Sequence, residues 1–245
     1  MSNLRLDKYL ADMQIGTRSE VKNYIKKRMV SINGSVAVRP EQKVDVDNDS
    51  ITFQGKMLTY VKYEYYMLHK PSGFVSATKD NVNETVVSLI PATKEIFPVG
   101  RLDKDTEGLL LLTNDGELAH NLLSPKKHVP KTYFAKVEGH VTNTDIECFL
   151  QGIDIGDETI TLPAQLKIME SGAISQVYIT ISEGRYHQIK RMFQAIDKRV
   201  IYLKRISMGS LTLDDNLRIG EYRKLTDIEV EQLTKMGSEM KGYEE

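Results

Sequence analysis

Three carboxylates at short spacing lead directly into an apolar segment of the chain. Asp103, Asp105 and Glu107 precede the run Leu109–Leu112, and an Asp115–Gly116 turn follows. Four leucines are too few to span a membrane, and they predict a strand that is buried on both faces. We therefore expect the two aspartates on a polar loop at the edge of the core, where a carboxylate is held firmly and still reaches a substrate. Alternatively, these acids only cap the strand as solvated side chains.

Length and composition are those of an ordinary globular protein. The chain has 245 residues, of which 40% are hydrophobic and 27% are charged, enough for a small and a medium-sized domain. No stretch has the length of a membrane-spanning helix, and the N-terminus lacks the apolar core of a signal peptide. The single cysteine, Cys148, cannot form an internal disulfide, and no cysteine–histidine spacing indicates a zinc site. These features predict a protein of the reducing cytoplasm.

The net charge of −1 conceals a basic N-terminal region. Residues 1–58 carry ten Lys or Arg against seven Asp or Glu, whereas the rest of the chain carries 23 against 27. Much of the basic charge lies within about three helical turns, at Arg18, Lys22, Lys26, Lys27 and Arg28. A solvated helix surface is the default explanation of such a cluster, and phosphate backbone is the partner that it would suit.

Two short helices and a hairpin are expected in residues 1–58. Apolar residues at helical spacing begin at Leu6, and Gly16 can end that first helix. Thr17 and Glu20 have the spacing of a capping box, which opens a second helix. Two short strands then flank Asn33–Gly34, the strongest short-range signal for a hairpin.

From residue 59 onward, strands and helices are mixed without regular alternation. This order favours an α+β fold with a mostly antiparallel sheet, in a second domain over residues 59–240. The expected strands, besides the leucine run, cover residues 63–68, 132–137, 162–168 and 175–181. The expected helices cover residues 117–123, 143–151, 186–196 and 227–236.

The order of these motifs resembles that of a known enzyme family. The run from Gly100 to Gly116 resembles the signature of the pseudouridine synthases that modify ribosomal RNA. Three further segments resemble other motifs of the same family: His69–Gly73, Lys131–Tyr133 and Glu183–Phe193. In the first domain, Leu4–Asp47 resembles the small S4-like RNA-binding domain. Its marks are Arg5–Leu10, Thr17–Glu20 and Val30–Gly34.

The resemblance implies an enzyme that isomerises a uridine to pseudouridine. That reaction cuts the carbon–nitrogen bond between uracil and ribose, turns the base and rejoins it through carbon. Because substrate and product contain the same atoms, no cofactor and no metal are expected. The implied catalytic residues are Asp103 as the carboxylate, Tyr133 as the ring against a flipped-out uracil, and Lys190 as the cation that keeps Asp103 charged. Lysine at this position departs from the arginine that is common in the superfamily.

The same resemblance implies contacts with RNA. In the S4-like domain these are phosphate contacts that position the RNA without reading its sequence: Arg5, Lys8, Arg18, Ser19, Lys22 and Lys26. In the second domain, Arg101 and Arg185 are expected to contact phosphate or to brace the Asp103 loop. Asp105 is expected to hold that loop through backbone hydrogen bonds. His187 is expected on a helix surface or at the RNA, because no second metal ligand is spaced for it.

Within the family, two features favour the branch that acts on small-subunit (16S) rRNA. These are the segment Glu183–Gln188 and the short acidic tail Lys241–Glu245. The expected partner is rRNA or a small-subunit assembly intermediate, bound by a monomeric protein. The alternatives are large-subunit (23S) rRNA, a non-catalytic rRNA-binding protein, and a carboxylate-based glycosidase or base-excision enzyme that acts on nucleic acid. A non-catalytic copy would be expected to lose Asp103, Tyr133 or Lys190, and excision of the base would require an activated water.

Overall fold

The computed structural model describes residues 3–92 and 94–239, so the acidic tail, residues 241–245, lies outside the described residues. The chain divides into two compact units. The first comprises residues up to 64 together with 92–95, and the second comprises residues 65–91 and those from 96 onward. Among the described residues, no helix combines the length and the apolar character needed to cross a membrane.

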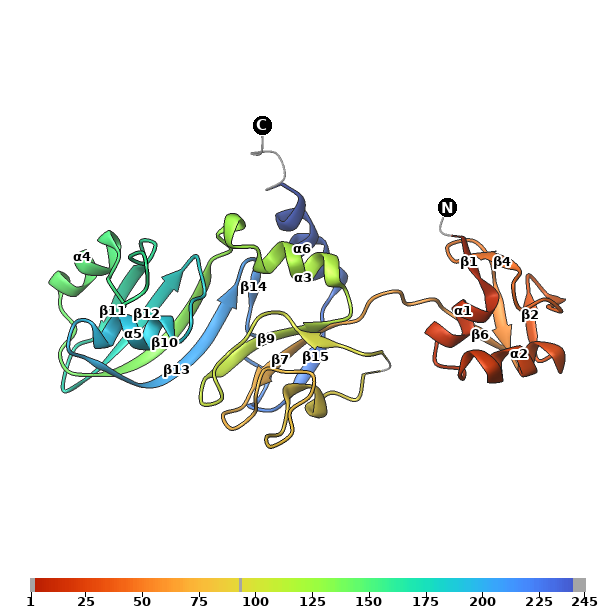
Figure 1. Cartoon of the computed structure of the whole chain (residues 1–245), viewed down its shortest axis with the longest axis horizontal. Helices are drawn as coiled ribbons and strands as arrows, with labels where there is room; N and C mark the ends of the chain where they lie inside the picture. The colour runs from red at the N-terminus through yellow and green to blue at the C-terminus, as the bar shows by residue number, and fades with distance from the viewer. Residues whose placement is uncertain (1–2, 93, 240–245) are drawn as a thin grey trace. The chain divides into compact units, whose positions relative to one another are not determined.

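The first unit contains two helices, α1 (Leu6–Asp12) and α2 (Arg18–Lys26), and six short strands (Figure 1). A two-stranded antiparallel sheet is formed by β1 (Asn3–Arg5) and β4 (Lys43–Asp45). A four-stranded antiparallel sheet has the order β3 (Ser35–Val36), β2 (Val30–Ile32), β5 (Ile51–Phe53) and β6 (Lys56–Leu58). The apolar faces of the helices and strands enclose a small core that includes Leu6, Leu10, Val21, Ile25 and Val30.

Local sequence signals place the second helix and the hairpin correctly. The Glu20 carboxylate accepts a hydrogen bond from the backbone N–H of Thr17 at 2.7 Å, and the Thr17 hydroxyl accepts one from the N–H of Glu20 at 3.3 Å. This is the predicted capping box. Asn33 and Gly34 have φ of 51° and 80°, the left-handed conformations that a tight two-residue hairpin turn requires.

The prediction that Gly16 ends the first helix is wrong. The helix stops after Asp12, and Gln14 takes the left-handed conformation with φ 54°. The N–H of Gln14 bonds to the carbonyl of Ala11, and the N–H of Ile15 bonds to that of Leu10. These two bonds form a Schellman ending, in which Ile15 returns to the core. The return of that apolar side chain outweighs the small cost of left-handed backbone at a glutamine.

The second unit is built on one large sheet (Figure 1), whose described strands are nine in number. Its main order is β11 (Gln165–Glu170), β12 (Ile174–Ile181), β10 (Lys131–Glu138), β13 (Arg199–Met208), β9 (Glu107–Thr113), β7 (Tyr65–Lys70) and β15 (Tyr222–Lys224). Two short strands, β14 (Leu211–Thr212) and β8 (Phe97–Pro98), pair with β13 and β9. Among the described pairs, β9 and β13 alone run parallel, so the predicted α+β fold with a mostly antiparallel sheet is confirmed.

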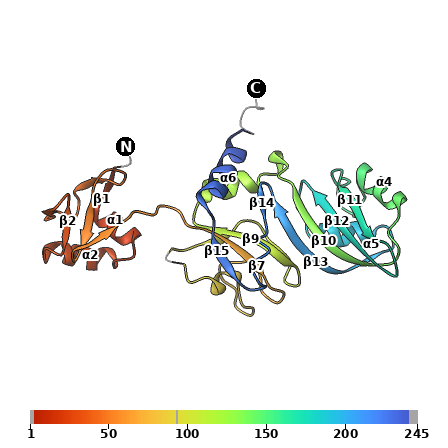
Figure 2. The same ribbon diagram turned by 180° about the vertical axis from the view of Figure 1, so that it is seen from behind.

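The helices of this unit are α3 (Gly116–Leu123), α4 (Asn143–Gln151), α5 (Gln188–Gln194) and α6 (Asp227–Glu239), with short 3-10 turns at Val86–Leu89 and Pro125–Lys127. Helices α3 and α6 lie side by side, as the front and back views both show (Figures 1 and 2). Helix α4 packs on β11, and α5 packs on β13.

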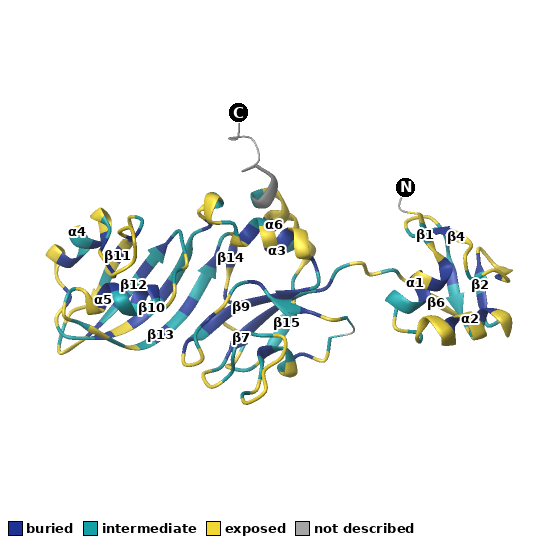
Figure 3. Ribbon diagram, in the orientation of Figure 1, coloured by how far each residue is buried: buried dark blue, intermediate teal, exposed yellow. Residues whose placement is uncertain are grey.

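Strand β9 is buried on both faces, as its sequence predicts. The side chains of Leu109–Leu112 are at most 1% exposed, and the strand is dark blue along most of its length in Figure 3. It lies between β7 and β13, and α3 and α6 contribute Leu118, Leu122 and Leu233 to the apolar cluster around it. The loop that precedes β9 and carries Asp103 is therefore attached to the most deeply buried strand of the unit.

Three predicted elements begin later than expected, and one of them is the strand predicted over residues 63–68, which starts at Tyr65. The helix predicted over residues 186–196 starts at Gln188, because His187 has φ 48° and lies outside the helical region. The strand predicted over residues 162–168 starts at Gln165, because the N–H of Ala164 bonds instead to the carbonyl of Phe149 at the end of α4.

Gly108 permits the parallel contact between β9 and β13. It faces Arg205 in the strand register and has φ 105°, and a Cβ atom there would collide with the Arg205 backbone. We predict that Gly108→Ala lowers the free energy of unfolding by roughly 2–5 kcal/mol, measured by urea denaturation. Gly116→Ala is the control, because a Cβ at Gly116 meets no atom within 4 Å. Equal stability of the two variants would contradict the close approach.

Candidate active site

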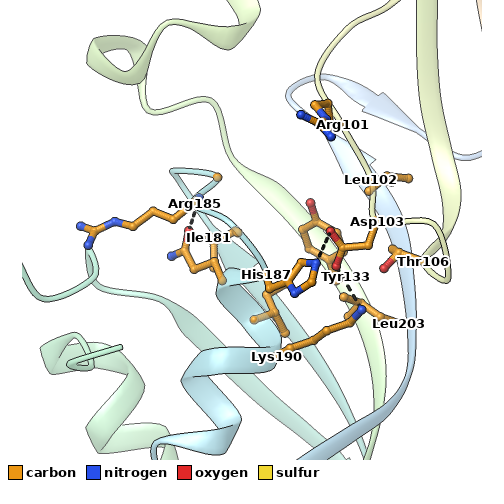
Figure 4. Close-up of a pocket in the computed structure, with 13 residues that line it drawn as sticks. Arg101, Leu102, Asp103, Thr106, Tyr133, Ile181, Arg185, His187, Lys190 and Leu203 are labelled. Atoms are coloured by element: carbon orange, nitrogen blue, oxygen red, sulfur yellow. Dashed lines mark hydrogen bonds and ion pairs between the residues drawn. The ribbon is translucent and has the colours of Figure 1, made fainter. Parts of the chain in front are cut away.

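The predicted catalytic residues come from three different elements and converge. Asp103 lies on the loop between β8 and β9, Tyr133 lies on β10, and Lys190 lies on α5. All three line one cavity of about 70 Å³, together with the apolar side chains of Ile181 and Leu203. Figure 4 shows the carboxylate of Asp103 between the ring of Tyr133 and the ammonium of Lys190.

Lys190 binds two carboxylates. Its Nζ lies 3.1 Å from Oδ2 of Asp103 and 2.7 and 2.9 Å from the two carboxylate oxygens of Asp105. Burial opposes the charged form of Lys190, but the hydrogen bonds to Asp105 and Asp103 outweigh it and raise the pKa of the lysine. The predicted ion pair between Asp103 and Lys190 is confirmed, and the lysine is shared with a second acid.

Asp105 has a different partner from the one predicted. Its side chain is 71% exposed and directs its carboxylate to Lys190, not mainly to the backbone of the loop. Burial acts to raise the pKa of Asp105, but the hydrogen bond and charge of Lys190 outweigh that effect and lower it. The pKa of Asp105 is lowered and that of Lys190 is raised, so the pair is charged across the neutral range. Its contribution to stability is lost below pH 3.8, as Asp105 protonates, and above pH 10.5, as Lys190 deprotonates.

Lys70 supports the loop that carries Asp103. Its side chain is fully buried, and its Nζ lies 2.8–3.2 Å from the backbone carbonyl oxygens of Pro71, Asp103, Lys104 and Thr106. Burial lowers the pKa of Lys70 to about 8, against the opposing charges of the nearby carboxylates. Lys70 therefore has the bracing role that the sequence analysis assigned to Asp105. A lysine at the end of an apolar strand, directly before a proline, is the signal that could have pointed to it.

The hydroxyl of Tyr133 lies beside Asp103 without a hydrogen-bond partner among the described residues. The residue is only 7% exposed and lies opposite Ile179 of β12 and Arg205 of β13. Its hydroxyl has no hydrogen bond to any residue in the described part of the chain. The hydroxyl is thus available to a bound molecule in the cavity.

His187 is a contact of Asp103 that sequence reasoning missed. Its Nε2 lies 3.5 Å from Oδ1 of Asp103, whereas Lys190 contacts the other carboxylate oxygen, Oδ2 (Figure 4). The left-handed backbone of His187 directs the ring toward the loop, and no sequence pattern signals that conformation at a histidine. Within residues 3–92 and 94–239, no group of three or more His, Cys, Asp or Glu side chains could hold a metal ion.

The two arginines predicted near the site differ in their surroundings. The guanidinium of Arg185 extends away from Asp103 (Figure 4) and donates to the carbonyls of Thr159 and Ile160 and to Glu183. Arg185 therefore braces the segment of Thr159 and Ile160 and not the Asp103 loop, and these bonds occupy the guanidinium that a phosphate contact would use. Arg101 is exposed and has no partner among the described residues, so its guanidinium is available.

The six residues predicted to contact RNA in the first unit are all exposed: Arg5, Lys8, Arg18, Ser19, Lys22 and Lys26. Arg5 also bonds through Nε and Nη2 to Asp7, at 3.0 and 2.8 Å. That hydrogen bond lowers the pKa of Asp7, which is 4% exposed. Arg5 is therefore positioned by the first turn of α1 while its charge remains at the surface.

Comparison with known proteins identifies the family. Residues 64–195, more than half of the chain, match the model of a family described as RNA pseudouridylate synthase. The chain belongs to this family. Residues 4–51 match the S4 domain, so the synthase carries an N-terminal RNA-binding domain of the kind that its sequence predicts.

Similar proteins align with the synthase over nearly its whole length. A Bacillus subtilis protein described as an uncharacterized RNA pseudouridine synthase, YtzG, is 46% identical over 94% of this chain and 98% of its own. The ribosomal small subunit pseudouridine synthase A of Yersinia pestis is 39% identical over 93% of this chain and 97% of its own. A crystal structure of a pseudouridylate synthase, 38% identical, superposes with a TM-score of 0.66 and covers 94% of this chain and 99% of that one.

Removing the Lys70 ammonium should disturb both stability and catalysis. We predict that Lys70→Met lowers the free energy of unfolding of the synthase by at least about 2 kcal/mol, because it leaves buried carbonyls unpaired. Turnover of uridine should fall by roughly 10- to 100-fold as the Asp103 loop loses its support. Urea denaturation and single-turnover assays measure the two effects.

Lys131→Met is the matched control for this variant. Burial also lowers the pKa of Lys131 to about 8, but its Nζ donates to one carbonyl, that of Val129. We expect a smaller loss of stability there. If both variants lost turnover equally, Lys70 would have no special role in holding the loop.

Proposed function

We propose that this synthase isomerises a specific uridine to pseudouridine in small-subunit (16S) rRNA, with Asp103 as the catalytic carboxylate. The observation that carries the proposal is the carboxylate of Asp103, held by Lys190 at 3.1 Å beside Tyr133 in one cavity. The choice of substrate is supported by relatives named ribosomal small subunit pseudouridine synthase A, which align over almost the whole chain.

The reaction exchanges one glycosidic bond for another. The N1–C1′ bond of the uridine breaks and a C5–C1′ bond forms, while C5 loses a proton and N1 gains one. Asp103 would attack the sugar or the base, so that one fragment is bound covalently to the enzyme while the cavity retains the other until the C5–C1′ bond forms. The Lys190 ammonium orients the carboxylate and stabilises its negative charge through a charge-assisted hydrogen bond. No cofactor is expected in this scheme.

Tyr133 would hold the base during the turn. Its ring can stack on a flipped-out uracil, and its free hydroxyl lies in the same cavity as Asp103 and can take part in proton transfer. Flipping a nucleotide out of folded RNA costs a few kcal/mol. Phosphate contacts from the exposed basic residues of the S4 domain can offset that cost. We propose that the enzyme acts as a monomer in the cytoplasm, on free rRNA or on an assembly intermediate.

The target is tested by mapping pseudouridines in rRNA from cells with and without this protein. We expect one site in 16S rRNA to lose its pseudouridine while 23S rRNA is unchanged. Loss in 23S rRNA instead would transfer the same chemistry to the large subunit. An unchanged map, together with an inactive purified protein, would favour a non-catalytic rRNA-binding protein.

Asp103→Asn should abolish isomerisation and leave RNA affinity nearly unchanged. The amide keeps the shape of the carboxylate but is not a nucleophile, so we expect a loss of at least about 10³-fold in single-turnover rate. Asp105→Asn is the matched control on the same loop and should lower the rate only in part. If Asp105→Asn were inactive and Asp103→Asn active, the roles of the two acids would be reversed.

The S4 domain is tested by neutralising α2 in the full-length chain. We predict that changing Arg18, Lys22 and Lys26 together to Gln weakens rRNA binding and flattens the dependence of log affinity on log salt. The slope should fall by up to ~0.9 per lost phosphate contact for duplex RNA, or ~0.7 for a single strand. The control variant carries the same change at three exposed basic residues outside α2: Arg39, Lys43 and Lys56. An unchanged slope in the α2 variant would mean that this helix is only a solvated surface.

A further inference from the structure

Tyr186 is a large aromatic side chain that the fold leaves exposed next to the catalytic loop. It is 75% exposed, and its ring stacks on that of His187 with centroids 3.9 Å apart and planes inclined by 17°. His187 in turn contacts Asp103. The stack therefore extends from the candidate catalytic carboxylate to the protein surface.

The backbone under this stack is held firmly. Arg191 of α5 donates from Nη1 to the carbonyl of Tyr186 at 3.1 Å, and its Nη2 forms an ion pair with Asp157. The left-handed backbone of His187 fixes the turn between Tyr186 and the helix. The Tyr186 hydroxyl has no hydrogen-bond partner among the described residues. A turn held by these bonds thus presents a tyrosine ring at the surface. One face of the ring stacks on His187, and the ring as a whole is mostly exposed.

The stack forms one wall of an outer cavity. This cavity measures about 430 Å³, against about 70 Å³ for the cavity that holds Tyr133, and Asp103 borders both. Val75 and Arg101 line it as well, and Arg101 has no partner among the described residues. An aromatic face and a free guanidinium on one open cavity are the two elements of a site for single-stranded nucleic acid.

We propose that the outer cavity binds the unpaired nucleotide adjacent to the target uridine. Its base stacks on the free face of Tyr186, and its phosphate pairs with Arg101. The proposal rests on the proposed function, because it requires the target uridine to enter the inner cavity beside Asp103. Stacking is tolerant of base identity, so the site takes a ribonucleotide of any base. Its effect is to hold the strand next to the flipped uridine.

The test uses the full-length synthase and a 16S rRNA fragment that contains the mapped uridine. The variants are Tyr186→Ala and Tyr186→Phe, with Ile219→Ala as the control for loss of an exposed apolar side chain. We expect Tyr186→Ala to weaken RNA binding roughly tenfold, which is within the range for loss of one base–aromatic stack, with most of the kinetic effect on KM. Tyr186→Phe should restore binding, and Ile219→Ala should match the unchanged protein.

RNA that lacks one base identifies the partner of the ring. Two further fragments carry an abasic residue on the 5′ or the 3′ side of the target. The unchanged protein should bind one of these abasic fragments as weakly as Tyr186→Ala binds the intact fragment. Tyr186→Ala should bind that abasic fragment and the intact fragment equally well. Arg101→Gln should lower the salt slope by ~0.7, the value for one contact to single-stranded RNA.

Several outcomes would overturn the proposal. Equal binding of Tyr186→Ala and the unchanged protein would remove the stacking role, while isomerisation by the unchanged protein would leave the proposed function in place. A loss confined to kcat would show that Tyr186 acts only through His187 on Asp103. If Tyr186→Ala weakened binding by the same factor with each abasic fragment as with the intact fragment, neither adjacent base would touch the ring. An unchanged protein with no isomerase activity would overturn the proposed function itself.

Discussion

A buried ammonium group must be surrounded by acceptors, and in this synthase those acceptors belong to the loop that carries the candidate nucleophile. Lys70 is fully buried, and its Nζ reaches the backbone carbonyls of Asp103, Lys104 and Thr106, which all follow the Cα of Asp103 in the chain. Lys70 thereby holds the loop through backbone atoms. The carboxylate of Asp103 takes no part in this support, so it is free to face Lys190 and the cavity.

Because Lys70 binds the backbone of the loop, the side-chain carboxylates of the loop are left to interact with Lys190. Lys190 stands between Asp103 and Asp105, and the more exposed of the two acids has the shorter contacts with it. Asp105 thus holds the lysine in place while Asp103 keeps its second oxygen toward His187. One cation, two acids and an imidazole form a preorganised polar group, which is how enzymes stabilise charge that changes during a reaction.

Local patterns in the sequence were sufficient where local forces decide the structure. The Thr17–Glu20 capping box and the buried run Leu109–Leu112 both follow from spacing and residue type. The contact between Asp103 and Lys190 was predicted from the resemblance to a family, because their spacing in the sequence does not indicate it. The end of α1 at Gln14, and the contact of His187 with Asp103, depend on left-handed backbone at residues that seldom adopt it. Tertiary packing selects those backbone conformations, so no local sequence pattern predicts them.

The parallel pairing of β9 with β13 joins two parts of the sheet whose own strands share longer registers. Its register contains two residue pairs, whereas β10 and β12 share eight and β7 and β9 share six. Asp103 and Lys70 belong to the β7–β9 part, while Tyr133 and Lys190 belong to the part built on β10 and β13. The candidate site is therefore assembled across the shortest strand pairing in the main order of the described sheet. A local opening along that pairing would separate Asp103 from Lys190 before either part lost its own fold, so the geometry of the candidate site and the global stability are distinct properties of this protein.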